Sequence, residues 1–384
     1  MKRKVLYFMP DNPMSGKAGN TTRLNYMLSY FNESRELDVT FVSLRDWGMW
    51  KKEEEALFHE KFPNIHLRLL NKKYKKSFFK YLFLYKIPYL FKRNSIDTTS
   101  YILRKEFSDI VKESFFDIVL ISYATWGRLG SKVPSESYKI IDTHDFITAQ
   151  SRHKSTIGKL FQDEISILKQ YDNIWTYSVE EEYIFDQFTN KEVTLMPVSF
   201  PDNFNNKAPE YKYDIVYVAS DNPHNIKGIQ WFLKEVLPLL KNVKIHIVGK
   251  IGKAIAEDYP NVIKYGMVDD LQEFYNHAKV AICPMLSGTG VKIKVLEALS
   301  YGLPIVTSRR GVDGLVNKKN NGCLVSQDPV EFSEAILKLM SDDVFYEKVK
   351  QQGICYFKEN HNSEIEKEIL DSIFYKTYEE KNLS

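Results

Sequence analysis

Cysteine is scarce in this chain of 384 residues, and its thiols are poorly placed for cross-linking or metal binding. The three cysteines, Cys283, Cys323 and Cys355, are odd in number and widely spaced. No pair has the spacing of metal ligands, so we expect no metal site. Two of the three fall in apparent strands, which is typical of buried thiols in a reducing compartment.

Long apolar runs and a strong charge of one sign are also missing. No stretch reaches the roughly 20 apolar residues that a membrane-spanning helix needs. Residues 4–9 already read as a core strand and no small-residue cleavage site is present, so we expect no signal peptide and a cytoplasmic location. A formal net charge of +3 is too small to indicate a nucleic-acid partner by itself.

The chain does contain a regular alternation of short apolar runs and longer helical patterns, which favours parallel α/β layers. Its length exceeds that of a usual single core, so two domains are expected. A polar stretch with two prolines and an Asn-Asn pair separates the halves. We therefore predict a first domain at 1–199, a linker at 200–211 and a second domain at 212–384 that ends in helices, which pack on the second domain or, for the last of them, cross back to the first.

The expected elements follow from the same alternation. Strands of the first half are predicted at 5–8, 39–42, 65–69, 118–122, 139–141, 174–177 and 193–196. The second half is predicted to start with a strand at 214–219, a helix at 227–240 and strands at 244–248 and 280–284.

The most informative stretch is residues 280–306, where a strand runs into a glycine turn, a short cationic helix and another strand. Gly288 and Gly290 let the backbone approach a ligand, and a helix N-terminus attracts anions. Lys292 and Lys294 add positive charge, and Glu297 is suited to accept hydrogen bonds from ribose hydroxyls. The order predicts a nucleotide-diphosphate site, although an ordinary strand-turn-helix unit with surface lysines has the same spacing.

Residues 283–325 resemble the donor half of retaining GT-B glycosyltransferases of family 4. The resemblance is carried by Glu-Ala-Leu-Ser-Tyr-Gly-Leu-Pro-Ile-Val at 297–306 and by Asn-Gly-Cys-Leu-Val at 321–325. It implies an α/β fold of the GT-B class, with two Rossmann-like domains facing across a cleft. The first domain would bind the acceptor and the second the nucleotide sugar, and the anomeric configuration would be retained.

The resemblance also implies roles for single residues. Glu297 would hold the ribose, and the turn of Gly288, Gly290 and Val291 would lie against the diphosphate. Many members carry a second glutamate eight positions before the first, and here that position is Thr289, which forms hydrogen bonds but supplies no charge. We assign Thr289 to the transferred sugar.

Further donor-side residues match the family in the first part of the second domain. Lys227 matches a lysine that contacts the diphosphate, whereas the expected arginine is Ser220. Lys292, Lys294 or His224 would have to replace that cation, and we favour Lys292 because it lies at the start of the helix. Gly249, together with residues 266–270, resembles the region of the nucleotide base.

The first half of the sequence contains fewer recognisable site motifs. Gly16 begins a loop that follows the first strand, where the family places a glycine loop beside the cleft. Lys17 is not the lysine of an ATPase P-loop, because the required glycine four residues before the Gly-Lys pair is absent. His144 follows the strand at 139–141 and matches a family histidine near the transferred sugar, with Asp145 as its orienting partner; a simple loop histidine is the alternative.

Residues 72–93 contain eight lysines and arginines, no acidic residue, and aromatic side chains between them. This composition predicts contact with an anionic membrane surface. A basic helix whose aromatic residues pack into the core is the alternative. Nucleic acid also binds basic and aromatic surfaces, but no nucleic-acid-binding module is recognisable, so we expect none.

We therefore expect a metal-independent, cytoplasmic, peripheral membrane enzyme that transfers a sugar from a nucleotide diphosphate to a glycan or lipid-linked acceptor. It would act in the synthesis of cell-surface polysaccharide or glycoconjugates. A non-catalytic GT-B subunit that binds glycan or supports a partner enzyme is the second hypothesis, motivated by Thr289 and Ser220. A nucleotide-sugar epimerase is the third, although the several acid-base carboxylates it needs are not recognisable.

Overall fold

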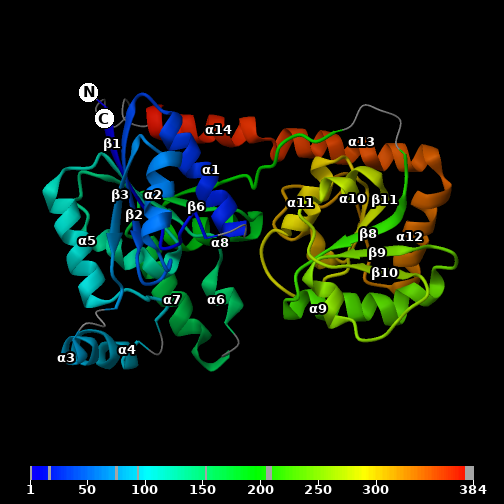
Figure 1. Ribbon diagram of the computed structural model, residues 1–384, viewed down its shortest axis with the longest axis horizontal. Helices are drawn as coiled ribbons and strands as arrows, with labels where there is room; N and C mark the ends of the chain where they lie inside the picture. Colours follow the sequence, from blue (N-terminus) through cyan, green and yellow to red (C-terminus); the bar gives the residue numbers. More distant parts are fainter. Residues whose placement is uncertain are drawn as a thin grey trace. The chain divides into compact units, whose positions relative to one another are not determined.

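The computed structural model describes residues 2–15, 19–73, 77–92, 95–151, 154–204 and 210–376. The chain divides into two compact units. Unit 1 comprises Met1–Thr176 and Glu181–Leu195, and unit 2 comprises Tyr177–Glu180 and Met196–Ser384. Each is an α/β body with a parallel sheet (Figure 1), so the predicted class of two Rossmann-like domains is confirmed.

Within the described residues, unit 1 forms a seven-stranded parallel sheet in the order β3-β2-β1-β4-β5-β6-β7. Its strands are β1 (Arg3–Phe8), β2 (Leu37–Leu44), β3 (Ile65–Leu70), β4 (Ile118–Ser122), β5 (Tyr138–Asp142), β6 (Asn173–Thr176) and β7 (Glu192–Leu195). The helices are α1 (Gly19–Glu33), α2 (Lys52–Lys61), α3 (Phe78–Tyr81), α4 (Ile87–Leu90), α5 (Tyr101–Glu113), α6 (Ile147–Gln150), α7 (Ile157–Leu168) and α8 (Val179–Thr189).

Helices cover both faces of this sheet, which explains the continuous apolar runs of its strands. Side chains alternate between faces along a strand, so Tyr7 and Phe8 of β1 point in opposite directions. Tyr7 packs against Phe31 of α1, with ring centroids 5.7 Å apart. Phe8 packs against Phe107 of α5 at 6.0 Å.

Unit 2 repeats this plan with a six-stranded parallel sheet, in the order β10-β9-β8-β11-β12-β13 over the part of the chain that is described. Its strands are β8 (Tyr213–Val218), β9 (Ile245–Val248), β10 (Val262–Tyr265), β11 (Ala278–Cys283), β12 (Ile305–Thr307) and β13 (Cys323–Val325). The helices are α9 (Pro223–Trp231), α10 (Gln272–His277), α11 (Ile293–Ser300), α12 (Pro329–Ser341), α13 (Asp343–Asn360) and α14 (Ser363–Asp371).

The core of unit 2 is likewise built on both faces of its sheet. Tyr217 of β8 lies in a cluster with Ile229 of α9 and Phe332 of α12. Val216, its neighbour, lies in the other cluster with Leu296 of α11. The two ends of α9 and α11 that face the strand ends are therefore fixed by packing.

The segment predicted as a linker, residues 200–211, is partly attached to unit 2. Phe200 donates its N–H to the carbonyl oxygen of His361 (3.1 Å), and Asn203 donates its N–H to that of Ser300 (3.0 Å). The division between the units falls after Leu195 rather than after residue 199. The polar composition of 199–211 marked the region but not its attachment.

Candidate functional site

The strand order of unit 2 reverses between β8 and β11, and ligands of open α/β sheets bind at the carboxyl ends of strands at such a point. Two turns meet there. The first, after β8, contains Ser220 and leads into α9, and the second, after β11, leads through Gly288 and Gly290 into α11. Gly288 and Gly290 have φ values of 107° and 69°, in the left-handed region that favours glycine.

Hydrogen bonds hold these two turns together. His224, at the start of α9, lies 2.8 Å from the Ser287 Oγ through its Nδ1. The buried Asn225 donates its side-chain amide to the Ser220 carbonyl oxygen at 3.0 Å and accepts a hydrogen bond from the Lys294 ammonium. Sequence reasoning missed Asn225; its position at the start of the helix that follows a predicted strand was the available signal.

The two lysines at the start of α11 are turned inward. Lys292 is 5% exposed, and its ammonium donates to the carbonyl oxygens of Thr289 (3.2 Å) and Gly290. Lys294 lies 5.2 Å from the centroid of the Tyr217 ring. Burial lowers the pKa of both ammonium groups from their ordinary value. Lys292 therefore stabilises the glycine turn through these hydrogen bonds, and its positive charge lies next to that turn.

Lys227 contrasts with these two lysines, since it is exposed on α9. The next residue, Gly228, allows α9 to lie close to the end of β11: a Cβ at this position would be 2.5 Å from the Pro284 carbonyl oxygen. The glycine thus brings the start of α9 and its lysine next to the turn after β11.

Glu297 lies about one turn into α11, as predicted, and is half-buried. Its carboxylate accepts a hydrogen bond from the Tyr275 hydroxyl at 3.1 Å, and the Tyr275 ring stacks on Tyr301 at 5.2 Å. Burial raises the pKa of Glu297 above its ordinary value. One of its oxygens is therefore oriented by Tyr275, and a carboxylate has further acceptor positions.

The remaining donor-side residues take different positions. Thr289 is exposed at the top of the glycine turn. Val291 packs on Gly314, where a Cβ would lie 2.4 Å from the valine Cγ2. Gly249 has a φ of 104°, follows β9, and lies against the β8 end, since a Cβ there would be 2.4 Å from the Ala219 carbonyl oxygen. Gly16 lies outside the described residues.

In unit 1 the predicted histidine lies at the corresponding edge of the sheet. His144 follows β5 with a φ of 59°, and Tyr123 follows the neighbouring β4 with a φ of 67°. Their rings stack with centroids 4.2 Å apart. Two residues other than glycine in the left-handed region, stacked on adjacent strand ends, are a strained arrangement of the kind found at functional sites.

The orienting partner of His144 differs from the prediction. The carboxylate beside its Nε2 belongs to Asp142, at 3.2 Å, rather than to Asp145. His144 has a left-handed backbone at this position, and Asp142 is the last residue of β5. Asp145 instead closes the turn by donating its N–H to the Thr143 carbonyl oxygen at 2.7 Å.

Further polar residues that sequence reasoning missed line this edge of unit 1. Asp11, after β1, accepts hydrogen bonds from the Tyr123 hydroxyl (3.2 Å) and from the Trp47 indole N–H (3.1 Å). The Arg23 Nε lies 3.9 Å from the Asp142 carboxylate. Each follows or faces a strand end, so the rule that ligands bind at carboxyl ends was the available signal.

Two buried carboxylates fix the loop that follows His144. Glu164 accepts the N–H groups of Ile147 (2.9 Å) and Thr148 (2.8 Å). Glu181 accepts the N–H of Phe146 (3.2 Å) and the Thr176 hydroxyl (2.9 Å). Burial raises the pKa of Glu181 to about 7. The loop is therefore held by these two carboxylates in addition to the hydrogen bonds of its own turns.

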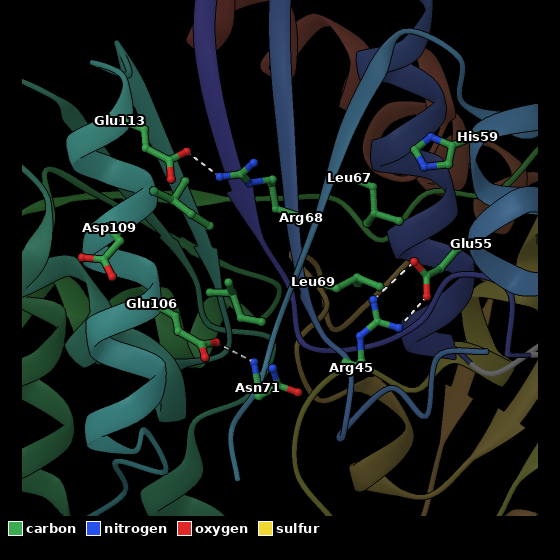
Figure 2. Close-up of a pocket in the computed structure, with 12 residues that line it drawn as sticks. Arg45, Glu55, His59, Leu67, Arg68, Leu69, Asn71, Glu106, Asp109 and Glu113 are labelled. Atoms are coloured by element: carbon green, nitrogen blue, oxygen red, sulfur yellow. Dashed lines mark hydrogen bonds and ion pairs between the residues drawn. The ribbon is translucent and has the colours of Figure 1, made fainter. Parts of the chain in front are cut away.

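A separate pocket of about 450 Å³ lies on unit 1 along the edge strand β3, between α2 and α5 (Figure 2). Its charges are largely paired: Arg45 with Glu55, Arg68 with Glu113, and Glu106 with the Asn71 N–H. None of the predicted site residues lines this pocket. It is a polar surface groove apart from the site at the strand ends.

The described residues contain no group of three or more histidine, cysteine, aspartate or glutamate side chains able to hold a metal ion. Among the helices of the described ranges, none is both long and apolar enough to cross a membrane.

Sequence comparisons connect unit 2 with sugar transfer. Residues 212–342 match the family model described as glycosyl transferases group 1. An uncharacterised 44.6 kDa protein in the cps region of Klebsiella pneumoniae is 24% identical over 195 residues, which are 47% of this chain and 49% of that protein. The chain thus matches about half the length of this relative. An uncharacterised glycosyltransferase of Haemophilus influenzae is 22% identical over 348 residues, 86% of this chain and 88% of that protein.

Solved structures share the fold over nearly the whole chain. Sucrose-phosphate synthase from Thermosynechococcus elongatus has a TM-score of 0.70 at 14% identity, covering 99% of this chain and 100% of that one. HepE from Anabaena, in complex with UDP and glucose, has a TM-score of 0.66 at 10% identity, covering 97% and 100%. The fold shared over nearly the whole chain therefore places this protein in the GT-B fold class, and its residues 212–342 are similar to glycosyl transferases group 1.

Proposed function

We propose that unit 2 binds a nucleotide diphosphate sugar, and that the chain transfers the sugar, with retention of configuration, to a hydroxyl of a glycan or lipid-linked acceptor. The supporting observation is the left-handed turn of Gly288 and Gly290, which leads into the N-terminus of α11 at the switch point of the sheet. The cps-region relative favours a role in the synthesis of cell-surface polysaccharide or glycoconjugates.

The diphosphate would lie against this turn. Backbone N–H groups at the start of α11 and the exposed Lys227 would bind its oxygens. Lys292 and Lys294, behind the turn, add positive charge without direct contact. In the transfer step the bond between the anomeric carbon and the diphosphate oxygen breaks, so these preorganised groups meet the charge that develops, and no metal is required.

The nucleoside would extend toward Glu297, whose carboxylate accepts hydrogen bonds from the ribose hydroxyls. Its orientation by Tyr275 supports this role, because the free acceptor positions are then fixed before the ligand arrives. Gly249, at the end of β9, borders the base region, where Met267 is 72% exposed. HepE from Anabaena, which shares the fold, was solved with UDP and with UDP-glucose, so a uridine nucleotide is the first donor to test.

We assign catalytic roles to the two polar residues that remain. Thr289, exposed on the donor turn, would form a hydrogen bond with the transferred sugar. In unit 1, His144 would contact the reacting groups at the acceptor side, with Asp142 in place of Asp145 as the carboxylate that orients its ring. The stacked Tyr123 supports the same ring position.

We also propose that the chain works on the cytoplasmic side of the membrane, as a peripheral protein on its inner face. The basic and aromatic composition of residues 72–93 supports this location.

Incubation of the purified chain with UDP-, GDP-, ADP- and dTDP-sugars tests the donor assignment. We expect slow release of one nucleoside diphosphate by donor hydrolysis, and loss of that release in Lys227→Ala. The same panel tests the epimerase hypothesis, which predicts an epimer of the intact donor. Binding of the donor without hydrolysis or transfer would favour the non-catalytic subunit. If no nucleotide binds, the site assignment fails.

A further inference from the structure

Large apolar side chains of unit 1 are exposed together on one helical segment. α3, the π-helical turn Leu82–Lys86 and α4 follow one another directly, and neither that turn nor α4 contains a buried residue. The exposed fractions are 69% for Phe78, 71% for Phe79, 59% for Phe83, 70% for Leu90 and 85% for Phe91. A continuous exposed apolar surface of this kind is typical of an interaction site.

The segment has two different faces. Tyr81, Tyr85 and Tyr89 stack on one another with centroids 5.5 and 6.0 Å apart, and the Lys73 ammonium lies 5.5 Å from the Tyr85 ring. The π-helical turn between α3 and α4 also contacts α5 of unit 1. In Figure 1, α3 and α4 stand apart from the sheet of unit 1, beyond the end of α5. Tyr81 and Tyr85 are half-buried on the side toward the unit, whereas Tyr89 (53%) and the phenylalanines are exposed.

Both ends of the segment are fastened to unit 1. The Lys72 and Lys73 N–H groups donate to the Asp46 carboxylate at 2.9 and 2.7 Å. The Lys72 ammonium, 5% exposed in this fold, lies 4.6 Å from the Trp47 ring centroid and 4.7 Å from that of Trp126. At the other end, the Lys92 ammonium pairs with Asp97. The residues on both sides of the helical segment 78–91 are thus attached to unit 1.

These attachments correct the sequence prediction for residues 72–93. Lys72 is a buried tether, and burial lowers its pKa to about 8. The charge of Lys92 is met by Asp97. Neither is therefore available to a membrane, whereas Lys86 is exposed beside the phenylalanines. The alternative that the aromatic residues pack into the core is wrong for Phe78, Phe79 and Phe83.

We propose that residues 78–91 form an interfacial docking helix, which inserts its phenylalanines and Leu90 into the headgroup layer of an anionic lipid bilayer. The charge pattern selects this partner: without Lys72 and Lys92, the sequence from 72 to 93 still has six cations and no acidic residue, so it is complementary to anionic lipid. Aromatic rings suit the boundary between headgroups and acyl chains, and lysine stems extend to the phosphates above it.

The docking helix also bears on the acceptor, an inference that rests on the proposed function. Trp47, which covers the Lys72 tether, donates its indole N–H to Asp11 at the carboxyl edge of the unit 1 sheet. A bilayer held at residues 78–91 is therefore linked through two contacts to the edge that carries Tyr123 and His144. An acceptor anchored in the same bilayer fits this arrangement, so we infer a lipid-linked acceptor.

Vesicle co-sedimentation tests the docking helix. The full chain is mixed with vesicles of phosphatidylcholine alone or of phosphatidylcholine with phosphatidylglycerol. We expect the parent to bind the anionic vesicles, and the pair Phe78→Ser and Phe79→Ser to weaken that binding at least about tenfold. The matched control is the pair Phe115→Ser and Tyr183→Ser, two exposed aromatic residues elsewhere in unit 1 (48% and 69%), which should bind as the parent does.

Two further measurements keep the test decisive. Lys86→Gln should weaken binding to the anionic vesicles by a few-fold and leave neutral vesicles unaffected. Brominated lipid should quench the added fluorescence of Phe83→Trp but not that of Phe115→Trp, and this readout does not depend on a destabilising change. Far-ultraviolet circular dichroism and the thermal midpoint confirm that each variant is folded.

Three results would overturn the docking helix: a parent that ignores anionic lipid, a Phe78 and Phe79 variant that binds as the parent does, or a lipid-free dimer that this variant dissociates. The last would show that a second copy covers the surface. Nucleotide binding by unit 2 is measured separately on the same proteins. If it is absent while vesicles still bind, the donor assignment fails and the docking helix stands.

Discussion

At the scale of single residues, Glu297 is the most direct test of the donor site. Replacing it by glutamine keeps its shape and the partner for Tyr275 but removes the charge that strengthens hydrogen bonds to ribose. We expect affinity for the preferred nucleoside diphosphate to fall by about 1 to 3 kcal/mol in Glu297→Gln, measured by calorimetric titration. Tyr275→Phe, which removes only the orienting hydroxyl, should lose less. An unchanged affinity in Glu297→Gln would place the ribose elsewhere.

His361 gives a prediction for stability against pH. Its Nδ1 lies 3.1 Å from the Val198 carbonyl oxygen and its Nε2 3.1 Å from the Tyr356 hydroxyl, and burial lowers its pKa to about 4. The unfolded chain has the ordinary value of about 6.5, so between these values the unfolded state binds the extra proton. The free energy of unfolding should therefore fall by about 3 kcal/mol as the pH decreases across this window.

Urea unfolding of the parent and of His361→Gln at about pH 7 and about pH 5 measures this effect. The variant should be less stable at the higher pH, because two buried hydrogen bonds are disturbed, but its stability should change less between the two. His59→Gln, which removes an exposed histidine of α2, is the control for the loss of a histidine as such. Equal slopes in all three proteins would contradict a buried, neutral His361.

At the scale of elements, most strands were predictable because each is a short apolar run covered on both faces. β4 agrees with the prediction at both ends, whereas the ranges predicted for β1, β2 and β5 are slightly shorter than the observed strands. β10 was missed because its side chains are partly exposed at the edge of the sheet, so its sequence lacks a clear apolar run. α9 begins four residues before the predicted helix, since Asn222 caps it and Pro223 suits its first turn.

The site was predictable only in part, for a related reason. Glu297, Gly288 and Gly290 lie in a continuous motif, so the sequence placed them together. Contacts between separate strand ends are set by packing and backbone angles instead. The choice of Asp142 over Asp145 depends on a left-handed residue that is not glycine, and the inward turn of Lys292 and Lys294 depends on nearby carbonyl oxygens and Asn225.

Gly228 tests how closely α9 and β11 must approach. A Cβ there would lie 2.5 Å from the Pro284 carbonyl oxygen, which belongs to the backbone and cannot simply move aside. Gly228→Ala should destabilise unit 2 by about 1 to 3 kcal/mol, measured by urea unfolding. The control, Gly158→Ala, adds a methyl group to α7 with nothing within 4 Å and should stabilise by roughly 0.5 to 1 kcal/mol. A destabilisation of the same size in both would contradict the close approach.

At the scale of the whole molecule, the two units should respond differently to a nucleotide. A nucleoside diphosphate at 100 times its Kd should stabilise the unit that binds it by about 2.7 kcal/mol. We therefore expect slower amide hydrogen exchange in β8, β11 and α11 when the nucleotide is added, and little change in β1, β2 and β3. Protection concentrated in unit 1 would contradict the assignment of the donor site to unit 2.

Residues Tyr177–Glu180 belong to unit 2 although they lie in sequence between two segments of unit 1, and this has a consequence for synthesis on the ribosome. These residues emerge before α8 and β7 have completed unit 1, yet their partners come much later: the Glu180 carboxylate accepts the Gly314 N–H at 2.9 Å and the Lys318 ammonium at 2.6 Å. N-terminal domains generally fold first as the chain is made. During translation the Glu180 carboxylate, which accepts the Ser178 hydroxyl at 2.7 Å, gains its two later partners only after more than 130 further residues, its separation from Gly314 being 134. A nascent chain that stalls in this interval therefore carries a complete first sheet and a Glu180 carboxylate that still lacks Gly314 and Lys318.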